Sequence, residues 1–66
     1  MEFKYRNSIY IYENHLDYMA KQVANGFPFS DIYEEIMIGC YDYDYDLIDF
    51  VFDDVEKEVM KRVKDL

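Results

Sequence analysis

Apolar residues recur along most of the chain at three- and four-residue spacing, which is the period of an amphipathic helix. The first such run consists of Ile9, Tyr12, Leu16, Met19, Ala20 and Val23. At about 100° per residue these positions share one face, so we predict a first helix near residues 8–25. A rival interpretation makes residues 9–12 a strand, since Ile and Tyr both favour sheets, followed by a helix capped at Asn14. The length of the periodic run favours the helix.

Turn residues separate this helix from a second one. Asn25 and Gly26 predict a left-handed helix end, and Pro28 cannot continue a helix. Ser30 is a good N-cap for a second helix near residues 30–39, and Asp31 follows it in the first turn, where the helix dipole favours negative charge. The positions expected on its buried side are Ile32, Tyr33, Ile36, Met37 and Cys40.

The last part of the chain predicts a third helix near residues 46–65. Asp46 is expected to cap it, and Asp49, three residues later, is expected to complete a pairing like that of a capping box. Its apolar stripe consists of Ile48, Val51, Phe52, Val55, Val59, Val63 and Leu66. The fold expected is therefore all-α, a small three-helix bundle with short connections. The pattern of residues 2–6 fits either a short strand or the start of a helix.

The composition describes one small folded domain, residues 1–66, with a thin core. A content of 52% hydrophobic and 20% aromatic residues is too apolar for a disordered chain. The net charge of −8 argues against direct nucleic-acid binding and against anionic membranes, and it favours a basic protein partner. A lone cysteine cannot form an internal disulfide and no signal-peptide pattern opens the chain, so we expect a cytoplasmic protein.

Most of the excess charge lies in residues 41–58, which carry eight acidic residues against the single base Lys57. On the wheel of the third helix, four acids form a row opposite the apolar stripe: Asp46, Asp49, Asp53 and Glu56. Neighbours in such a row are about 5–6 Å apart, close to the spacing of phosphates along a nucleic-acid strand. Phe50 and Met60 fall on the acidic side, where an apolar side chain can anchor a protein contact.

The tyrosines of the same segment are candidates for the same contact. Tyr41, Tyr43 and Tyr45 alternate with Asp42 and Asp44. Their rings can stack on cations, and their hydroxyls together with the neighbouring carboxylates can accept hydrogen bonds from Arg and Lys. An ordinary solvated acidic helix surface is the competing explanation for residues 41–58.

The small size, the charge concentrated in residues 41–58 and the interleaved Tyr and Asp resemble the small acidic helical inhibitors, often phage-encoded, that mimic DNA against restriction, repair or CRISPR nucleases. The resemblance implies a non-enzymatic inhibitor or regulator whose acids occupy a basic cleft otherwise used for DNA or guide RNA. The residues in this role would be Asp42, Asp44, Asp46, Asp49, Asp53, Asp54, Glu56 and Glu58.

A different class of function remains open, a helical interaction module such as an adaptor, an antitoxin-like partner or a subunit of a homodimer. In that case the acids provide solubility, and the contact uses apolar and tyrosine surfaces. Ile11 and Tyr18, expected on the outer side of the first helix, could form such a second surface. The sequence does not choose between monomer and dimer.

Other chemistry finds little support in the sequence. Asp42, Asp44, Asp46 and Asp53 have the spacing of a calcium loop, but Leu47 stands where such loops need glycine. His15 has no second metal ligand near it in sequence and is expected to be exposed, while Cys40 is expected to be buried and unreactive. We therefore expect no enzyme activity, no metal site and no cofactor.

Overall fold

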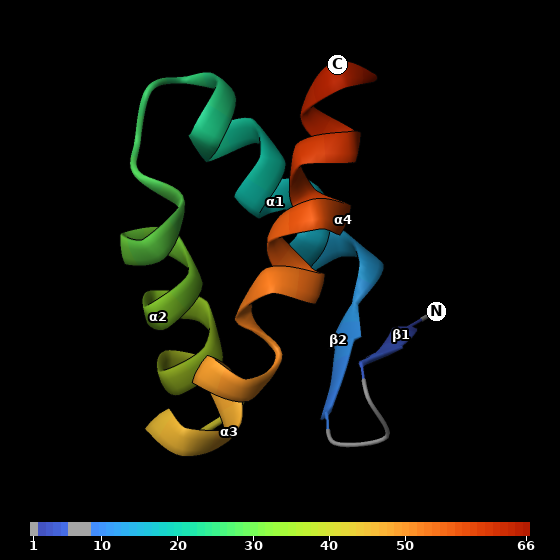
Figure 1. The fold of residues 1–66 in the computed structure, drawn as a ribbon. Helices are drawn as coiled ribbons and strands as arrows, with labels where there is room; N and C mark the ends of the chain where they lie inside the picture. Colours follow the sequence, from blue (N-terminus) through green and yellow to red (C-terminus); the bar gives the residue numbers. More distant parts are fainter. Residues whose placement is uncertain (1, 6–8) are drawn as a thin grey trace.

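The computed structural model describes residues 2–5, by their backbone, and residues 9–66. Within this part of the chain, two strands, β1 (Glu2–Tyr5) and β2 (Ile9–Tyr12), precede four helices. These are α1 (Glu13–Ala24), α2 (Phe29–Gly39), α3 (Tyr45–Phe50) and α4 (Phe52–Lys64). Figure 1 shows α1 packed beside α4, α2 flanking them, α3 across one end, and the hairpin beside the start of α1. The predicted small helical bundle with an N-terminal strand is confirmed.

The strands form an antiparallel hairpin in which Phe3 lies opposite Ile11 and Tyr5 opposite Ile9. The prediction of a helix from residue 8 is therefore wrong over residues 9–12, where the strand interpretation is correct. Ile9 and Ile11 are buried while Tyr10 and Tyr12 are exposed, so these positions follow the two-residue period of a strand. Residue 8, and residue 6 of the strand expected at 2–6, lie outside the described residues.

The predicted end of the first helix is confirmed. Gly26 has a φ of 102°, its N–H donates to the Val23 carbonyl at 3.0 Å, and the Phe27 N–H donates to the Gln22 carbonyl at 3.1 Å. This pair of hydrogen bonds is the Schellman motif, which needs a left-handed residue at its turn. The next helix begins earlier than predicted, because Pro28, whose φ of −62° suits a helix start, occupies the N-cap in place of Ser30.

The single helix predicted over residues 46–65 is wrong, because Val51 divides it into α3 and α4. Val51 has φ −103° and ψ 6°, outside the helical range, and its side chain is buried. The break lets α3 lie across the end of the bundle while α4 continues along α1 (Figure 1). No glycine or proline marks the position in the sequence.

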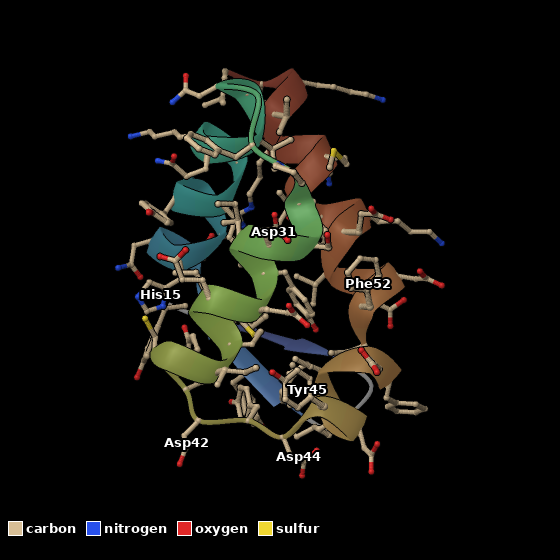
Figure 2. The ribbon with its side chains drawn as sticks, turned by 90° about the vertical axis from the view of Figure 1, so that its left-hand side faces the viewer. His15, Asp31, Asp42, Asp44, Tyr45 and Phe52 are labelled. Atoms are coloured by element: carbon tan, nitrogen blue, oxygen red, sulfur yellow. The ribbon has the colours of Figure 1, made fainter. Side chains whose placement is uncertain are left out.

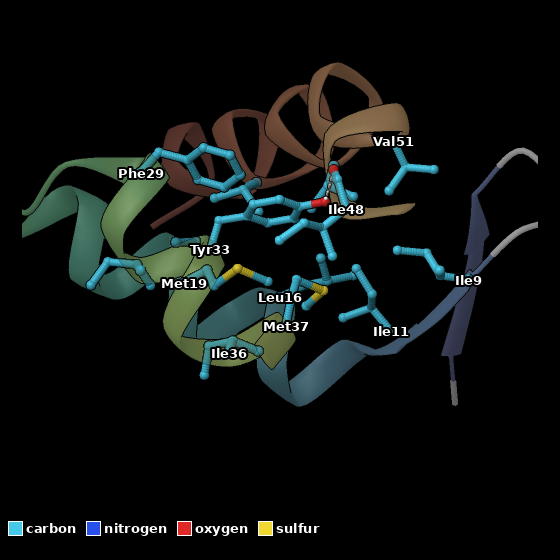
Figure 3. Close-up of a cluster of buried hydrophobic side chains, with 14 residues drawn as sticks. Ile9, Ile11, Leu16, Met19, Phe29, Tyr33, Ile36, Met37, Ile48 and Val51 are labelled. Atoms are coloured by element: carbon cyan, nitrogen blue, oxygen red, sulfur yellow. Dashed lines mark hydrogen bonds between the residues drawn. The ribbon is translucent and has the colours of Figure 1, made fainter. Parts of the chain in front are cut away.

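The core gathers side chains from β2 and from all four helices (Figure 3). Its buried members are Ile9, Ile11, Leu16, Met19, Ala20, Phe29, Ile32, Tyr33, Ile36, Met37, Ile48, Val51, Val55 and Val59. Most of the predicted apolar stripes are present, but Leu66 is 65% exposed and Cys40 is exposed, contrary to expectation. Ile11, expected to point outward, is buried because it belongs to a strand. In the described part of the chain, no helix combines the length and the apolar character needed to cross a membrane.

Candidate functional site

The charges of the protein are strongly partitioned along the chain. Residues 22–56 contain no Lys or Arg and ten acidic residues: Asp31, Glu34, Glu35, Asp42, Asp44, Asp46, Asp49, Asp53, Asp54 and Glu56. These residues span α2, the loop 40–44, α3 and the start of α4. Within residues 9–66, the Lys and Arg residues all lie in the second half of α1 or from Lys57 onward in α4. One end of the bundle is therefore acidic, and we call the loop 40–44 together with α3 the acidic end.

Local backbone structure holds the acids of this loop outward. Asp42 adopts a left-handed φ of 58°, which Asp tolerates better than most residues. Asp44 is the N-cap of α3, and its carboxylate accepts a hydrogen bond of 2.8 Å from the Leu47 N–H. The prediction that Asp46 caps this helix is wrong, because the chain is still extended at Asp44 and α3 starts at Tyr45. In Figure 2 the Asp42 and Asp44 side chains both point away from the bundle at its lower end.

The carboxylate row predicted on a single helix is broken by Val51. Asp46 and Asp49 belong to α3, whereas Asp53 and Glu56 belong to α4. The 5–6 Å spacing of neighbours on one helix therefore does not carry across the break. Asp46, Asp53 and Asp54 lie in first helical turns, where the helix dipole stabilises negative charge. Stabilisation by the helix dipole therefore explains part of this acidic charge without a binding partner.

Tyr41 and Tyr43 point toward β2 instead of toward solvent. The Tyr43 hydroxyl accepts from the Tyr10 N–H at 3.3 Å and donates to the Tyr10 carbonyl at 3.0 Å. The Tyr41 hydroxyl accepts from the Tyr12 N–H at 2.9 Å. Their rings stack with centroids 5.4 Å apart and planes 4° apart. Both hydroxyls, expected from the sequence to serve a partner, are thus bonded within the chain.

His15 belongs to the same cluster, and its predicted exposed position is wrong. Its Nδ1 shares a hydrogen bond of 2.5 Å with the Tyr41 hydroxyl, its ring packs edge-on against Tyr41, and it is half-buried. Burial raises the pKa of the Tyr41 hydroxyl above its ordinary value, although the hydrogen bond from the Tyr12 backbone acts in the opposite direction. The alternation of Tyr with Asp over residues 41–44 was the sequence signal for one inward and one outward side.

Tyr45 and Phe50 are the large exposed side chains of the acidic end, 61% and 54% exposed. They stand at the two ends of α3, with Asp46 and Asp49 between them in sequence. The exposed position predicted for Phe50 is confirmed. Met60, predicted on the same acidic side, instead packs half-buried against the core.

Glu58 belongs to a different arrangement, centred on Arg62. The Arg62 guanidinium contacts Glu58 at 2.8 Å, Asp17 at 2.7 Å and Glu13 at 3.4 Å, so it joins α4 to α1. Burial acts to lower the pKa of Arg62, but its hydrogen bonds to Glu58 and Asp17 raise it above the usual value. Glu58 is therefore held in an ion pair within the chain and is less available to a partner than the exposed acids of the acidic end.

A shallow depression of about 460 Å³ lies beside this ion-pair cluster. Its lining mixes acids and bases: Asp17, Lys21, Glu58, Lys61, Arg62, Asp65 and Leu66. Because this lining contains both acidic and basic side chains, it does not favour an anionic ligand over a cationic one. Among the side chains described, those of residues 9–66, no three His, Cys, Asp or Glu gather as a metal site would require.

Comparisons with protein-family models, with curated proteins and with solved structures found no match.

Proposed function

We propose that this protein is a non-enzymatic inhibitor or regulator that binds a basic, nucleic-acid-binding protein through its acidic end and competes there with the nucleic acid. The observation that carries this proposal is the complete lack of Lys and Arg across residues 22–56. Asp42, Asp46 and Asp49 are exposed, and none forms an ion pair with another residue in the described part of the chain. Such carboxylates attract and orient a basic surface.

The proposal rests on charge density and not on an imitation of phosphate spacing. The break at Val51 removes the straight row of carboxylates from which regular spacing was expected. Tyr45 and Phe50 supply exposed ring area beside the charge, and aromatic side chains are enriched among the residues that dominate protein interfaces. A nuclease such as a CRISPR or restriction effector is the kind of partner that the class resemblance suggests.

The first experiment identifies the partner and measures its salt dependence. The tagged protein is incubated with a cell lysate at low salt and eluted with a rising salt gradient. Affinity should fall steeply between about 50 and 500 mM salt, where the screening length shortens to a few Å. A DNA or RNA duplex should displace the protein from its partner. A complex that resists both salt and nucleic acid would refute the proposal.

Matched charge variants then locate the contact. Asp42→Asn, Asp46→Asn and Asp49→Asn together remove three charges from the acidic end. The control removes three exposed charges from α2: Asp31→Asn, Glu34→Gln and Glu35→Gln. We expect the first variant to lose much more affinity for the captured partner. Equal losses would show that net charge alone matters and would overturn the assignment to the acidic end.

A second candidate, a helical interaction module, is favoured by a separate group of exposed rings. Tyr10 and Tyr12 on β2 and Tyr18 on α1 are each more than 40% exposed. Binding through these side chains would depend little on salt and would be weakened by Tyr12→Ala and Tyr18→Ala. The salt gradient therefore separates the two candidates.

A further inference from the structure

The hydrogen bonds of β2 are divided between a strand on one edge and two tyrosine side chains on the other. Ile9 and Ile11 lie opposite Tyr5 and Phe3 of β1. The backbone groups on the opposite edge are those of Tyr10 and Tyr12, because successive residues of a strand point their N–H and C=O groups to alternate sides. When nothing covers it, an edge of this kind is a template for pairing with another chain.

Tyr41 and Tyr43 bond to this edge in the way a third strand would. The Tyr10 N–H, the Tyr10 carbonyl and the Tyr12 N–H each have a phenol hydroxyl as partner, at 3.3, 3.0 and 2.9 Å. One hydroxyl can both accept and donate, which is how Tyr43 serves two backbone groups of the same residue. The two rings stack with centroids 5.4 Å apart, and their hydroxyls reach the two residues on this edge, Tyr10 and Tyr12.

The cover is a loop whose backbone is bonded to the last turn of α2: the Asp42 N–H donates to the Ile38 carbonyl at 3.2 Å, and the Tyr43 N–H donates to the Met37 carbonyl at 3.1 Å. Loop 40–44 follows the end of α2, and Asp42, between the two tyrosines, holds a left-handed conformation with a φ of 58° that an L-residue rarely adopts. No backbone of this loop pairs with β2 among the hydrogen bonds of the described residues. The edge is therefore closed by side chains and not by a strand, and both tyrosine rings also pack against the core.

We infer that Tyr41 and Tyr43 mask a strand-pairing surface on β2, and that the occupant this surface fits is the same edge of a second copy of the chain. Residues 9–12 carry no charge and alternate Ile with Tyr, types that pair well across strands. A two-fold axis through the edge brings identical groups together antiparallel, as in the commonest class of dimer. Pairing would extend the two-stranded sheet to four strands, and two-stranded sheets alone are marginal.

The test removes the two hydroxyls and keeps the rings. The full chain carrying Tyr41→Phe and Tyr43→Phe is compared with wild type by sedimentation over a wide concentration range. The buffer holds about 1 M salt, where a screening length of about 3 Å suppresses repulsion between acidic copies. The control carries Tyr18→Phe and Tyr45→Phe, which remove two exposed hydroxyls that bond to nothing in the described part of the chain. We expect the first variant to dimerise and the control and wild type to stay monomeric.

Amide hydrogen exchange identifies the surface used. In the dimer, the Tyr10 and Tyr12 amides should be protected, and in dilute solution of the same variant they should exchange faster than in wild type. A variant that stays monomeric at every concentration, or a dimer whose Tyr10 and Tyr12 amides are unprotected, overturns the inference.

A measurement on the wild type alone keeps the inference testable if the variant does not fold. The Tyr10 and Tyr12 amides should exchange through local opening of the tyrosine cover, faster than the Val55 and Val59 amides in the buried part of α4. Exchange of all four amides only through global unfolding would show that the cover does not open separately and would overturn the inference.

Discussion

The hydroxyl of Tyr33 donates a hydrogen bond of 2.6 Å to the backbone carbonyl of Ile48, and both side chains are almost fully buried (Figure 3). The bond joins α2 to α3. Ile48 lies in the last turn of α3, where carbonyl groups lack a partner within their own helix. A core tyrosine thus completes the hydrogen bonding of the short helix that carries the acidic end.

Tyr33→Phe removes this hydroxyl and leaves a buried carbonyl unpaired, which should lower the free energy of unfolding by about 1–3 kcal/mol. Urea unfolding followed by circular dichroism measures the change. The matched control is Tyr18→Phe, whose hydroxyl is exposed and whose effect should stay within about 0.5 kcal/mol. Equal effects at the two positions would mean that the bond to Ile48 contributes nothing to stability.

The two glycines should respond in opposite directions to the same substitution. Gly26→Ala places a β-carbon on a residue with φ 102° and should destabilise the protein by about 1–2 kcal/mol, although no atom stands within 4 Å. Gly39→Ala falls at the end of α2 with equal space, and alanine there should stabilise by about 0.5–1 kcal/mol. Thermal unfolding of both variants gives the two signs. A neutral Gly26→Ala would contradict the role of the left-handed turn.

We expect Arg62 to stabilise the fold because its guanidinium contacts three carboxylates. Arg62→Met keeps much of the apolar stem and removes the contacts to Glu13, Asp17 and Glu58, which should cost about 1–2 kcal/mol. Arg62→Lys should recover only part of this loss, since one ammonium group cannot reproduce the planar fork. Urea unfolding at low and high salt measures both, with the exposed Lys64→Met as control. Full recovery by lysine would show that charge alone suffices.

The raised pKa of Tyr41 predicts a loss of stability at alkaline pH. The folded chain holds this phenol proton more tightly than the unfolded chain, so the contribution is fully present below about pH 10 and is lost as the pH rises toward the folded pKa. The difference in unfolding free energy between wild type and Tyr41→Phe should therefore narrow from about pH 9 to about pH 11. A gap that stays constant or widens would contradict the raised pKa.

The fold could be predicted where local signals were unambiguous. Asn25 and Gly26 marked a helix end, and the spacing of Ile32, Tyr33 and Ile36 fits only a helix. The sequence Ile9-Tyr10-Ile11-Tyr12 fits either period, and its pairing with β1 decides the outcome. The break at Val51 has no glycine or proline to mark it in the sequence, and the Tyr33–Ile48 hydrogen bond that ties α3 to α2 joins residues 15 positions apart.

The sequence predicts which residues the candidate site contains, but it does not predict how all of their side chains are oriented. The exposure of Phe50 and of the carboxylates in residues 41–49 follows from local pattern. The inward orientation of Tyr41 and Tyr43 depends on β2, which lies about thirty residues away in sequence. Helical spacing pairs Glu58 with Arg62, but it could not show that Arg62 also contacts two acids of α1.

The packing of α1 against α4 has a consequence for synthesis of the protein. Leu16 and Met19 of α1 share the core with Val55 and Val59 of α4, from the other end of the chain. When only the first half of the chain has been made, α1 therefore lacks the helix with which it makes its most extensive contacts. The native core cannot form until α4 has been synthesised. Until then the apolar face of α1 is accessible to chaperones and proteases.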